Sequence, residues 1–297
     1  MKRLKGIIFI VSGAMLWGAT GPLMEWLLNH TPLTVSFMLT IRLFIAGLLL
    51  LTYVALTKQP IFSIWKHTLW GRQLVIFGIV GMLGVQYSFV AAIHESNAIF
   101  ATLLQFLAPI FIVLYISLTM RKFPPRYQVI GILGTLFGLF LLLTNASIDS
   151  FLVSYKALFW GIAVGLTFAF YTLYPARLMK EWSVLLVVGW AMLIGGTALG
   201  IIGRVWQSSE WLVFTDFRIV GLMLALIVFG TLAFVLFLTS MKYISAVETS
   251  ILSSVEPLTA MLISMLVFST TLGGWQVVGI FVMLFCVTWL SIAGEKA

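Results

Sequence analysis

Charged side chains are scarce in this sequence. Only 9% of its 297 residues are Asp, Glu, Lys or Arg, whereas 62% are hydrophobic and the mean hydropathy is +1.14. A single soluble core cannot bury that much apolar surface. Lipid must therefore be the main solvent of this chain.

Cysteine and histidine are also scarce. The one cysteine, Cys286, excludes an intrachain disulfide and a cysteine-rich metal site. The three histidines, His30, His67 and His94, lie in or beside predicted loops and form no metal-binding or nucleophile–base motif. We expect no enzymatic activity, no metal and no other cofactor.

Acidic residues are few, and the 17 basic residues against 9 acidic ones give a net charge of +8. A nucleic-acid-binding protein would gather its Lys and Arg on one solvated face. Here they lie in short segments between apolar runs. The charge therefore does not predict a nucleic-acid partner.

Long unbroken apolar runs dominate the rest of the chain. In hydrocarbon every backbone polar group needs an internal partner, and such runs favour helices over alternating barrel strands. At about 20 residues per crossing, we predict an all-α integral membrane protein with ten transmembrane helices. They are predicted near 5–28, 33–56, 73–94, 97–120, 127–145, 155–176, 183–206, 218–241, 246–269 and 274–293.

The basic residues are distributed unevenly between the predicted loops. With the N-terminus inside, the outer side receives only Lys156, Arg204 and Arg218, Arg42 lies within a span, and the other basic residues are cytoplasmic. This bias orients helices during insertion. We therefore predict a multi-pass protein of the cell membrane with both termini in the cytoplasm.

The second half of the chain resembles the first at an offset of 148 residues. A mid-span proline followed at the same distance by Gln-x-x-Gly is hard to attribute to chance. The matched pairs are Gly47 with Gly195, Phe89 with Phe237, Ala98 with Ala246, Pro109 with Pro257, Gln128 with Gln276 and Gly131 with Gly279.

This duplication predicts two five-helix repeats, residues 1–148 and 149–297. Because five crossings is an odd number, the second repeat must run through the membrane in the opposite sense. Inverted repeats favour two near-equivalent conformations, each open to one side, with a binding site where the halves meet.

Glu256 is a candidate site residue because a carboxylate in mid-span costs roughly 2.5 to 3.5 kcal/mol on insertion scales. The next residue, Pro257, and its repeat mate Pro109 lack an N–H, so they should break their helices and free the carbonyls of Ser253 and Gln105. A buried structural partner for Glu256 and simple helix kinks are the alternative interpretation.

Helical spacing places Thr249, Ser253 and Glu256 on one stripe of the ninth predicted span. Gln105 lies on the matching stripe of the fourth. We therefore expect a polar pocket between these two helices.

Arg42 is the only cation predicted at mid-depth. It could pair with Glu256 or Glu25, or bind a substrate carboxylate, and a purely structural ion pair is equally compatible with the pattern. Glu25 and Glu248 are expected to reach toward water rather than form the centre of a site.

Four aromatic residues lie inside predicted spans: Trp17, Tyr87, Tyr171 and Trp190. Their faces could line a cavity and would suit an ammonium group. Simple packing is the alternative. Three glycine pairs, 134 with 138, 161 with 165 and 196 with 200, favour close packing of helices within the chain over a dimer interface.

Together these features resemble the drug/metabolite transporter superfamily and, within it, the EamA family of ten-helix carriers. The matching pieces are Leu16-Trp17-Gly18, Arg42-Leu43-Phe44, the stretch from Ala98 to Pro109, Glu256-Pro257, and Gln-x-x-Gly at 128 and 276. The resemblance implies a secondary exporter of amino acids or related metabolites with a central cavity. Lys122 and Thr270 stand where the family often has Leu-Gly-Glu, which leaves the subfamily and substrate open.

Other functions remain compatible with this pattern. They are import of a quaternary amine or another metabolite, and a non-transporting membrane scaffold. Coupling could use a proton carried by Glu256 or an exchange of substrates. A channel is disfavoured because it needs rings of matched polar residues, and two halves supply only pairs. Substrate, direction, coupling ion and oligomeric state have no readable signature.

Overall fold

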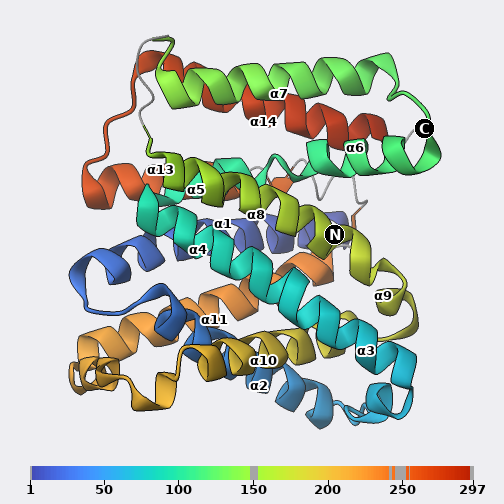
Figure 1. The fold of residues 1–297 in the computed structure, drawn as a ribbon, viewed down its shortest axis with the longest axis vertical. Coiled ribbons are helices and arrows are strands. Elements are labelled where there is room, and N and C mark those ends of the chain that lie inside the picture. The colour runs from blue at the N-terminus through green and yellow to red at the C-terminus, as the bar shows by residue number, and fades with distance from the viewer. Residues whose placement is uncertain (1, 148–152, 241–242, 245–251, 254, 295–297) are drawn as a thin grey trace.

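A computed structural model describes residues 2–147, 153–240, 243–244, 252–253 and 255–294. These residues fold as helices and connecting turns, without a strand among them (Figure 1). The predicted site residue Thr249 and the neighbouring Glu248 lie outside the described residues. The predicted all-α class is confirmed.

The first half of the chain contains α1 (Lys2–His30), α2 (Val35–Leu56), η1 (Ser63–Lys66), α3 (Thr68–Ile76), η2 (Phe77–Leu83), α4 (Gly84–Glu95), α5 (Ala98–Gln105), α6 (Ala108–Met120) and α7 (Arg126–Thr144). The second half contains α8 (Tyr155–Leu173), η3 (Tyr174–Ala176), α9 (Leu178–Glu181), α10 (Val184–Ile202), η4 (Val205–Gln207), η5 (Ser209–Thr215), α11 (Phe217–Ser240), α13 (Val255–Phe268) and α14 (Gly274–Gly294).

Eight apolar helical segments in the described residues are long enough to cross a membrane. Two of them are composite: α3, η2 and α4 form one segment, and α5 and α6 form another. The last two predicted spans coincide with shorter apolar helices, Val255–Phe268 and Gly274–Trp289. The described structure thus contains eight long spans where the sequence predicted ten.

Two of the spans are irregular near their middle. α5 ends at Gln105 and α6 begins at Ala108, with Pro109 in its first turn. Proline has no N–H to continue the ladder, and the chain turns tightly as Phe106 N donates to Leu103 O. In the third span, η2 is a π-helical segment, a rare form that frequently marks functional sites.

Helices related by the 148-residue offset pack antiparallel on each other. Along α7 and α14, position 134 lies against Cys286, position 138 against Gly279, and the carbonyl of Leu142 accepts from Gln276 at 3.0 Å. Residue numbers rise along one helix as they fall along the other, so the two run in opposite directions.

The same opposition holds for α2 and α10. Thr40 lies against Gly200, Leu43 against Gly196, and Gly47 against Gly189 and Leu193. Two pairs of repeat mates therefore cross the structure in opposite senses.

Contacts between other helices occur in matched sets. α1 packs on α11 and α13, and its repeat mate α8 packs on α4 and α6. Likewise α2 contacts α11, while its mate α10 contacts η2. These contacts thus have counterparts under the offset, and the helices form one bundle (Figure 1).

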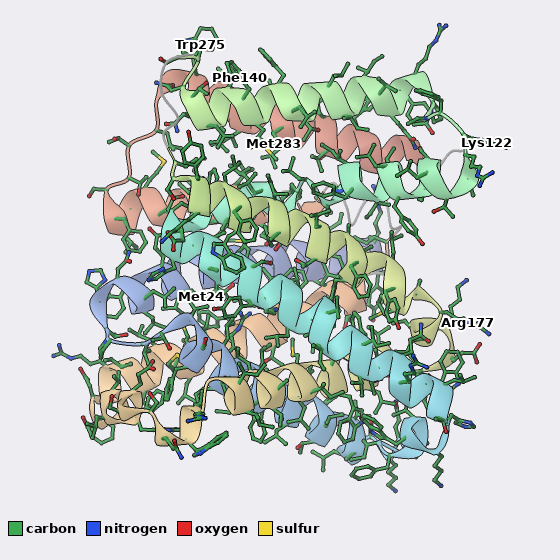
Figure 2. The ribbon with its side chains drawn as sticks, viewed as in Figure 1. Met24, Lys122, Phe140, Arg177, Trp275 and Met283 are labelled. Atoms are coloured by element: carbon green, nitrogen blue, oxygen red, sulfur yellow. The ribbon has the colours of Figure 1, made fainter. Side chains whose placement is uncertain are left out.

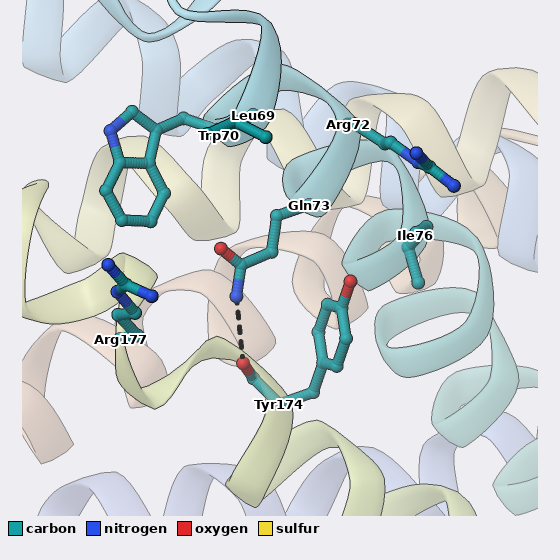
Figure 3. Close-up of a pocket in the computed structure, with 7 residues that line it drawn as sticks. All are labelled: Leu69, Trp70, Arg72, Gln73, Ile76, Tyr174 and Arg177. Atoms are coloured by element: carbon teal, nitrogen blue, oxygen red, sulfur yellow. Dashed lines mark hydrogen bonds between the residues drawn. The ribbon is translucent and has the colours of Figure 1, made fainter.

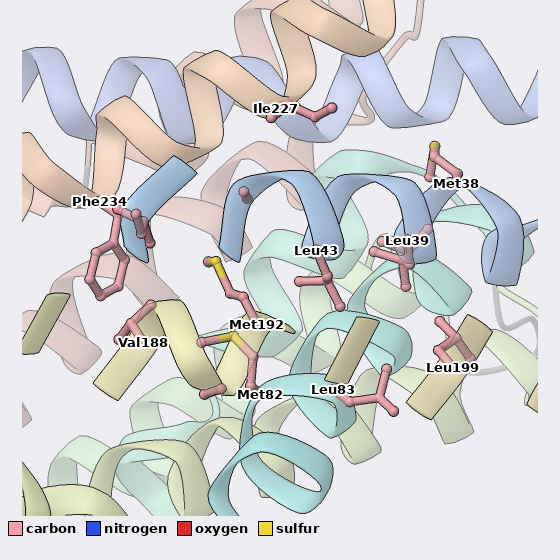
Figure 4. Close-up of a cluster of buried hydrophobic side chains, with 14 of the residues drawn as sticks. Met38, Leu39, Leu43, Met82, Leu83, Val188, Met192, Leu199, Ile227 and Phe234 are labelled. Atoms are coloured by element: carbon pink, nitrogen blue, oxygen red, sulfur yellow. The ribbon is translucent and has the colours of Figure 1, made fainter. Parts of the chain in front are cut away.

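Two clusters of buried apolar side chains stabilise the bundle. The larger gathers around α2, α10, η2 and α11 and includes Leu43, Met82, Met192 and Phe234 (Figure 4). The smaller joins α5 through α8 to α14. Large apolar side chains stay exposed at the periphery, such as Phe140 on α7 (Figure 2), as lipid-facing surface requires.

The glycine pairs serve helix packing within the chain, as predicted. Positions 134 and 138 face α14, positions 161 and 165 face α5 and the start of α6, and positions 196 and 200 face α2. A side chain at most of these positions would collide with the opposing helix.

Candidate functional site

Arg42 projects from α2 into the bundle and is only 7% exposed. Its Nη1 donates to Oε1 of Gln86 on α4 at 2.9 Å and lies 3.9 Å from Sδ of Met24 on α1. Its Nη2 lies 3.0 Å from where a Cβ on Gly230 of α11 would be. Four helices thus enclose one guanidinium.

An ion pair of Arg42 with Glu25 or Glu256, one of the alternatives that the sequence left open, is not formed among the described residues. Among the described residues Arg42 makes no ion pair, and its oxygen partner is the neutral amide of Gln86. A guanidinium has five N–H donors, so one hydrogen bond to an amide leaves most of its capacity available.

Glu25 has a different role from the predicted one. It is 7% exposed, and its Oε2 accepts from the backbone N–H of Ala98 at 2.8 Å. Asn97 supplies the neighbouring cap by accepting from Phe100 N at 2.9 Å. The expectation that Glu25 reaches toward water is wrong, because its carboxylate satisfies free donors at the start of α5.

Glu256 lies in the first turn of α13, and Ala260, one turn later on the same stripe, is fully buried. The carbonyl oxygen of Glu256 lies against the position that a Cβ on Gly18 would occupy. α1 can therefore approach the α13 backbone only because residue 18 has no side chain. Within the described residues, the Glu256 carboxylate has no hydrogen-bond or ion-pair partner.

Three of the four predicted aromatic residues pack inside the helix bundle, and the fourth, Trp190, does not. Trp17 lies 5.3 Å from Phe237 of α11 between ring centroids, Tyr87 lies 5.6 Å from Trp160, and Tyr171 lies 5.2 Å from Phe77. These three rings pack inside the bundle. They lie on α1, α4 and α8, respectively.

Trp190 lies apart from the other three. Its Nε1 donates to the carbonyl of Ile61 at 2.9 Å, and its ring meets Trp65 edge-on at 5.2 Å and Phe62 at 5.6 Å. It anchors the connection between α2 and α3, so the structure does not bring it to Arg42 or Glu256.

The structure brings the predicted polar residues of α5 and α13 only partly together. Gln105 ends α5 and Ser253 precedes α13, both half-buried, and α5 contacts α13. Pro257 is buried in the first turn of α13. The two cavities described in the structure are lined by other residues.

Gln86 and Met24 contact Arg42 and were not among the residues predicted from the sequence. Gln86 was visible as an amide in the middle of a predicted span. At the 148-residue offset Arg42 corresponds to Trp190 and Gln86 to Phe234. The Arg42–Gln86 pair is therefore confined to one half and is not a consequence of the duplication.

A family model and related sequences both identify this chain as a transporter relative. The EamA-like transporter family matches residues 4–144 and again residues 155–292. An uncharacterized inner membrane transporter of Salmonella typhimurium, YicL, is 39% identical over 278 residues, covering 91% of this chain and 90% of that protein. An uncharacterized transporter of Archaeoglobus fulgidus is 29% identical over 212 residues, covering 70% of this chain and 72% of its own.

A solved crystal structure shares the fold, with a TM-score of 0.62 over 98% of both chains at 15% sequence identity. Both halves match the family separately, and the matched segments contain Arg42 and Glu256. This chain belongs to the EamA-like transporter family of multi-pass membrane proteins.

Proposed function

We propose that this chain is a secondary active transporter that exports amino acids or related small metabolites by alternating access. Its working parts are two inverted repeats, residues 1–148 and 149–297, that together cross the membrane ten times. The antiparallel packing of α7 on α14 and of α2 on α10 supports this arrangement. Halves related in this way can exchange roles between inward-open and outward-open states.

The environment of Arg42 is the main support for an amino acid as the substrate. Among the described residues, the guanidinium enclosed by four helices has one oxygen partner, the neutral amide of Gln86. The described residues supply no counter-ion to this buried cation, and a substrate carboxylate offers the bidentate partner that a guanidinium favours. Binding an anion here stabilises the charged side chain as well as the ligand.

Glu256 provides a complementary acidic group on a helix that also packs against α1. Its backbone meets α1 at Gly18, whereas Arg42 meets α1 at Met24, six residues and about 9 Å further along the axis. The Trp17 ring, next to Gly18, adds an aromatic face. A ligand between these groups needs a negative end and a positive end, as an amino acid has.

The distribution of basic residues predicts how the protein is oriented in the membrane. Lys122 and Arg177 lie at one end of the bundle and Trp275 at the other (Figure 2). The end with Lys122 and Arg177 receives most of the basic residues, so we place it, with both termini, in the cytoplasm. The inner-membrane relative supports a plasma-membrane location.

Flux measurements in proteoliposomes test this proposal. Vesicles containing the purified protein are loaded with a radiolabelled amino-acid mixture, and release is followed with and without a pH gradient. We expect gradient-driven release that is lost in Glu256→Gln with unchanged thermal unfolding. The control is Glu181→Gln, since Glu181 is exposed on α9. Wild-type release by Glu256→Gln would contradict proton coupling through this residue.

A further inference from the structure

A cavity of about 390 Å³ opens between the start of α3 and the segment around η3. Its volume is within the range of small-molecule sites. The lining residues are Leu69, Trp70, Arg72, Gln73, Ile76, Tyr174 and Arg177 (Figure 3). None of them belongs to the intramembrane site around Arg42.

Two arginines from distant parts of the sequence line this cavity. Arg72 and Arg177 are both exposed and lie on opposite sides of Gln73 and the Tyr174 ring (Figure 3). No acidic side chain lines the cavity. Glu181, the acidic residue of α9, forms no ion pair with either arginine within the described chain. The cavity is thus cationic.

The remaining polar and aromatic residues hold the cavity in shape. Gln73 Nε2 donates to the carbonyl of Tyr174 at 3.3 Å, which ties α3 to η3. The Arg177 guanidinium lies 5.7 Å from the centroid of the Trp70 ring, a cation–π contact that keeps the charge near the mouth. Two helices and their basic side chains therefore form one site.

The site combines residues of both halves and has no equivalent at the positions related by the duplication. At the 148-residue offset Arg72, Gln73 and Arg177 correspond to Val220, Gly221 and Asn29. The duplicated fold alone would not produce two arginines here.

We propose that this cavity binds a phosphate-bearing anion, the headgroup of an anionic phospholipid. Basic pockets between helices at the cytoplasmic side suit such headgroups, and arginine is well matched to phosphate. The cavity also joins a lipid-facing surface: Leu69 at its rim is 83% exposed, and beyond Ile76 the helix presents Ile79 and Val80, 43% and 48% exposed. An acyl chain can follow that surface while its phosphate lies between the arginines.

This inference does not rest on transport. Delipidated full-length protein is titrated with phosphatidylglycerol, with phosphatidylcholine of the same chain length, and with inorganic phosphate. Binding is read by native mass spectrometry and by the thermal unfolding midpoint. We expect phosphatidylglycerol to bind and raise the midpoint, and phosphatidylcholine to bind much more weakly.

The matched variants remove two charges each. In Arg72→Gln/Arg177→Gln we expect affinity for phosphatidylglycerol to fall by about tenfold to thirtyfold, since each basic residue contributes roughly fivefold. Arg121→Gln/Arg126→Gln, two exposed arginines around the α6–α7 turn, should bind like wild type.

The outcomes distinguish a lipid headgroup from a soluble phosphate compound as the ligand. Stabilisation by inorganic phosphate that is lost in the Arg72/Arg177 variant supports the anion site and assigns it to a soluble phosphate compound. Lipid binding without a phosphate response assigns it to the headgroup. Equal binding of both lipids, or equal losses in the two double variants, would overturn the proposal.

Discussion

Gly138 and Gly279 face each other across α7 and α14 at backbone contact. A Cβ on Gly138 would lie 2.7 Å from the carbonyl oxygen of Gly279, and a Cβ on Gly279 would lie 2.6 Å from that of Gly138. The glycines come from opposite halves of the chain. The two halves therefore meet here with no side chain between them.

This contact predicts that Gly138→Ala destabilises the protein. The new methyl group would meet backbone that cannot move aside, and overpacking of this kind costs about 1 to 3 kcal/mol. Thermal unfolding of the detergent-purified variant should show a lower midpoint than wild type.

Gly221→Ala is the matched control for that variant. A Cβ at position 221 of α11 meets nothing within 4 Å, and alanine favours helix over glycine by roughly 1 kcal/mol. Its midpoint should equal or exceed that of wild type. Equal midpoints for Gly138→Ala and Gly221→Ala would show that the backbone contact is not tight.

Glu25 predicts a second stability effect. Glu25→Ala removes the acceptor for Ala98 N–H and should cost about 0.5 to 2 kcal/mol, the usual cost of losing a helix cap. Glu25→Gln keeps an acceptor oxygen and should cost less. Hydrogen exchange at Ala98 should quicken most in the alanine variant; unchanged exchange there would exclude the capping role.

Gln86→Glu should separate folding from transport. A carboxylate at position 86 would pair with Arg42 across the 2.9 Å contact and occupy the donors proposed for substrate. We expect the unfolding midpoint to be retained or raised while flux is lost. Gln86→Leu, which removes the acceptor, should lower the midpoint. Flux at the wild-type level in Gln86→Glu would place the substrate elsewhere.

Topology can be tested with cysteine labelling because the chain has a single native cysteine, Cys286. In a Cys286→Ser background, a membrane-impermeant maleimide added to intact cells should label Trp275→Cys, which is 56% exposed. Lys122→Cys, exposed at the opposite end, should react only after the membrane is opened. The reverse pattern would invert the proposed orientation.

Much of the helical framework could be predicted from apolar runs. The predicted 33–56 and 127–145 correspond to α2 and α7 within a few residues. Length and hydropathy decide helix formation in lipid, so the local sequence is enough to predict these two helices. The π-helical segment at Phe77–Leu83 had no comparable signal, since the hydrophobic run continues through it.

Polar partners were harder to predict than helices. The acidic and basic character of Glu25 and Arg42 was evident, but the partner of each depends on how distant helices meet. Glu25 caps a helix that begins 73 residues later, and Arg42 contacts an amide 44 residues away. Trp190 looked equivalent to the other intramembrane aromatics because its connection to Ile61 arises only from folding.

The most direct test of the account concerns the substrate carboxylate at Arg42. Thermal unfolding of the purified protein is measured with a panel of amino acids and, for each, the amine that lacks the carboxylate, in wild type and in Arg42→Lys. A ligand at about 100 times its Kd stabilises the state it binds by roughly 2.7 kcal/mol. We predict that at least one amino acid raises the wild-type midpoint, that its amine does not, and that Arg42→Lys loses most of the response. Equal stabilisation by the amine, or an unchanged response in Arg42→Lys, would contradict the account.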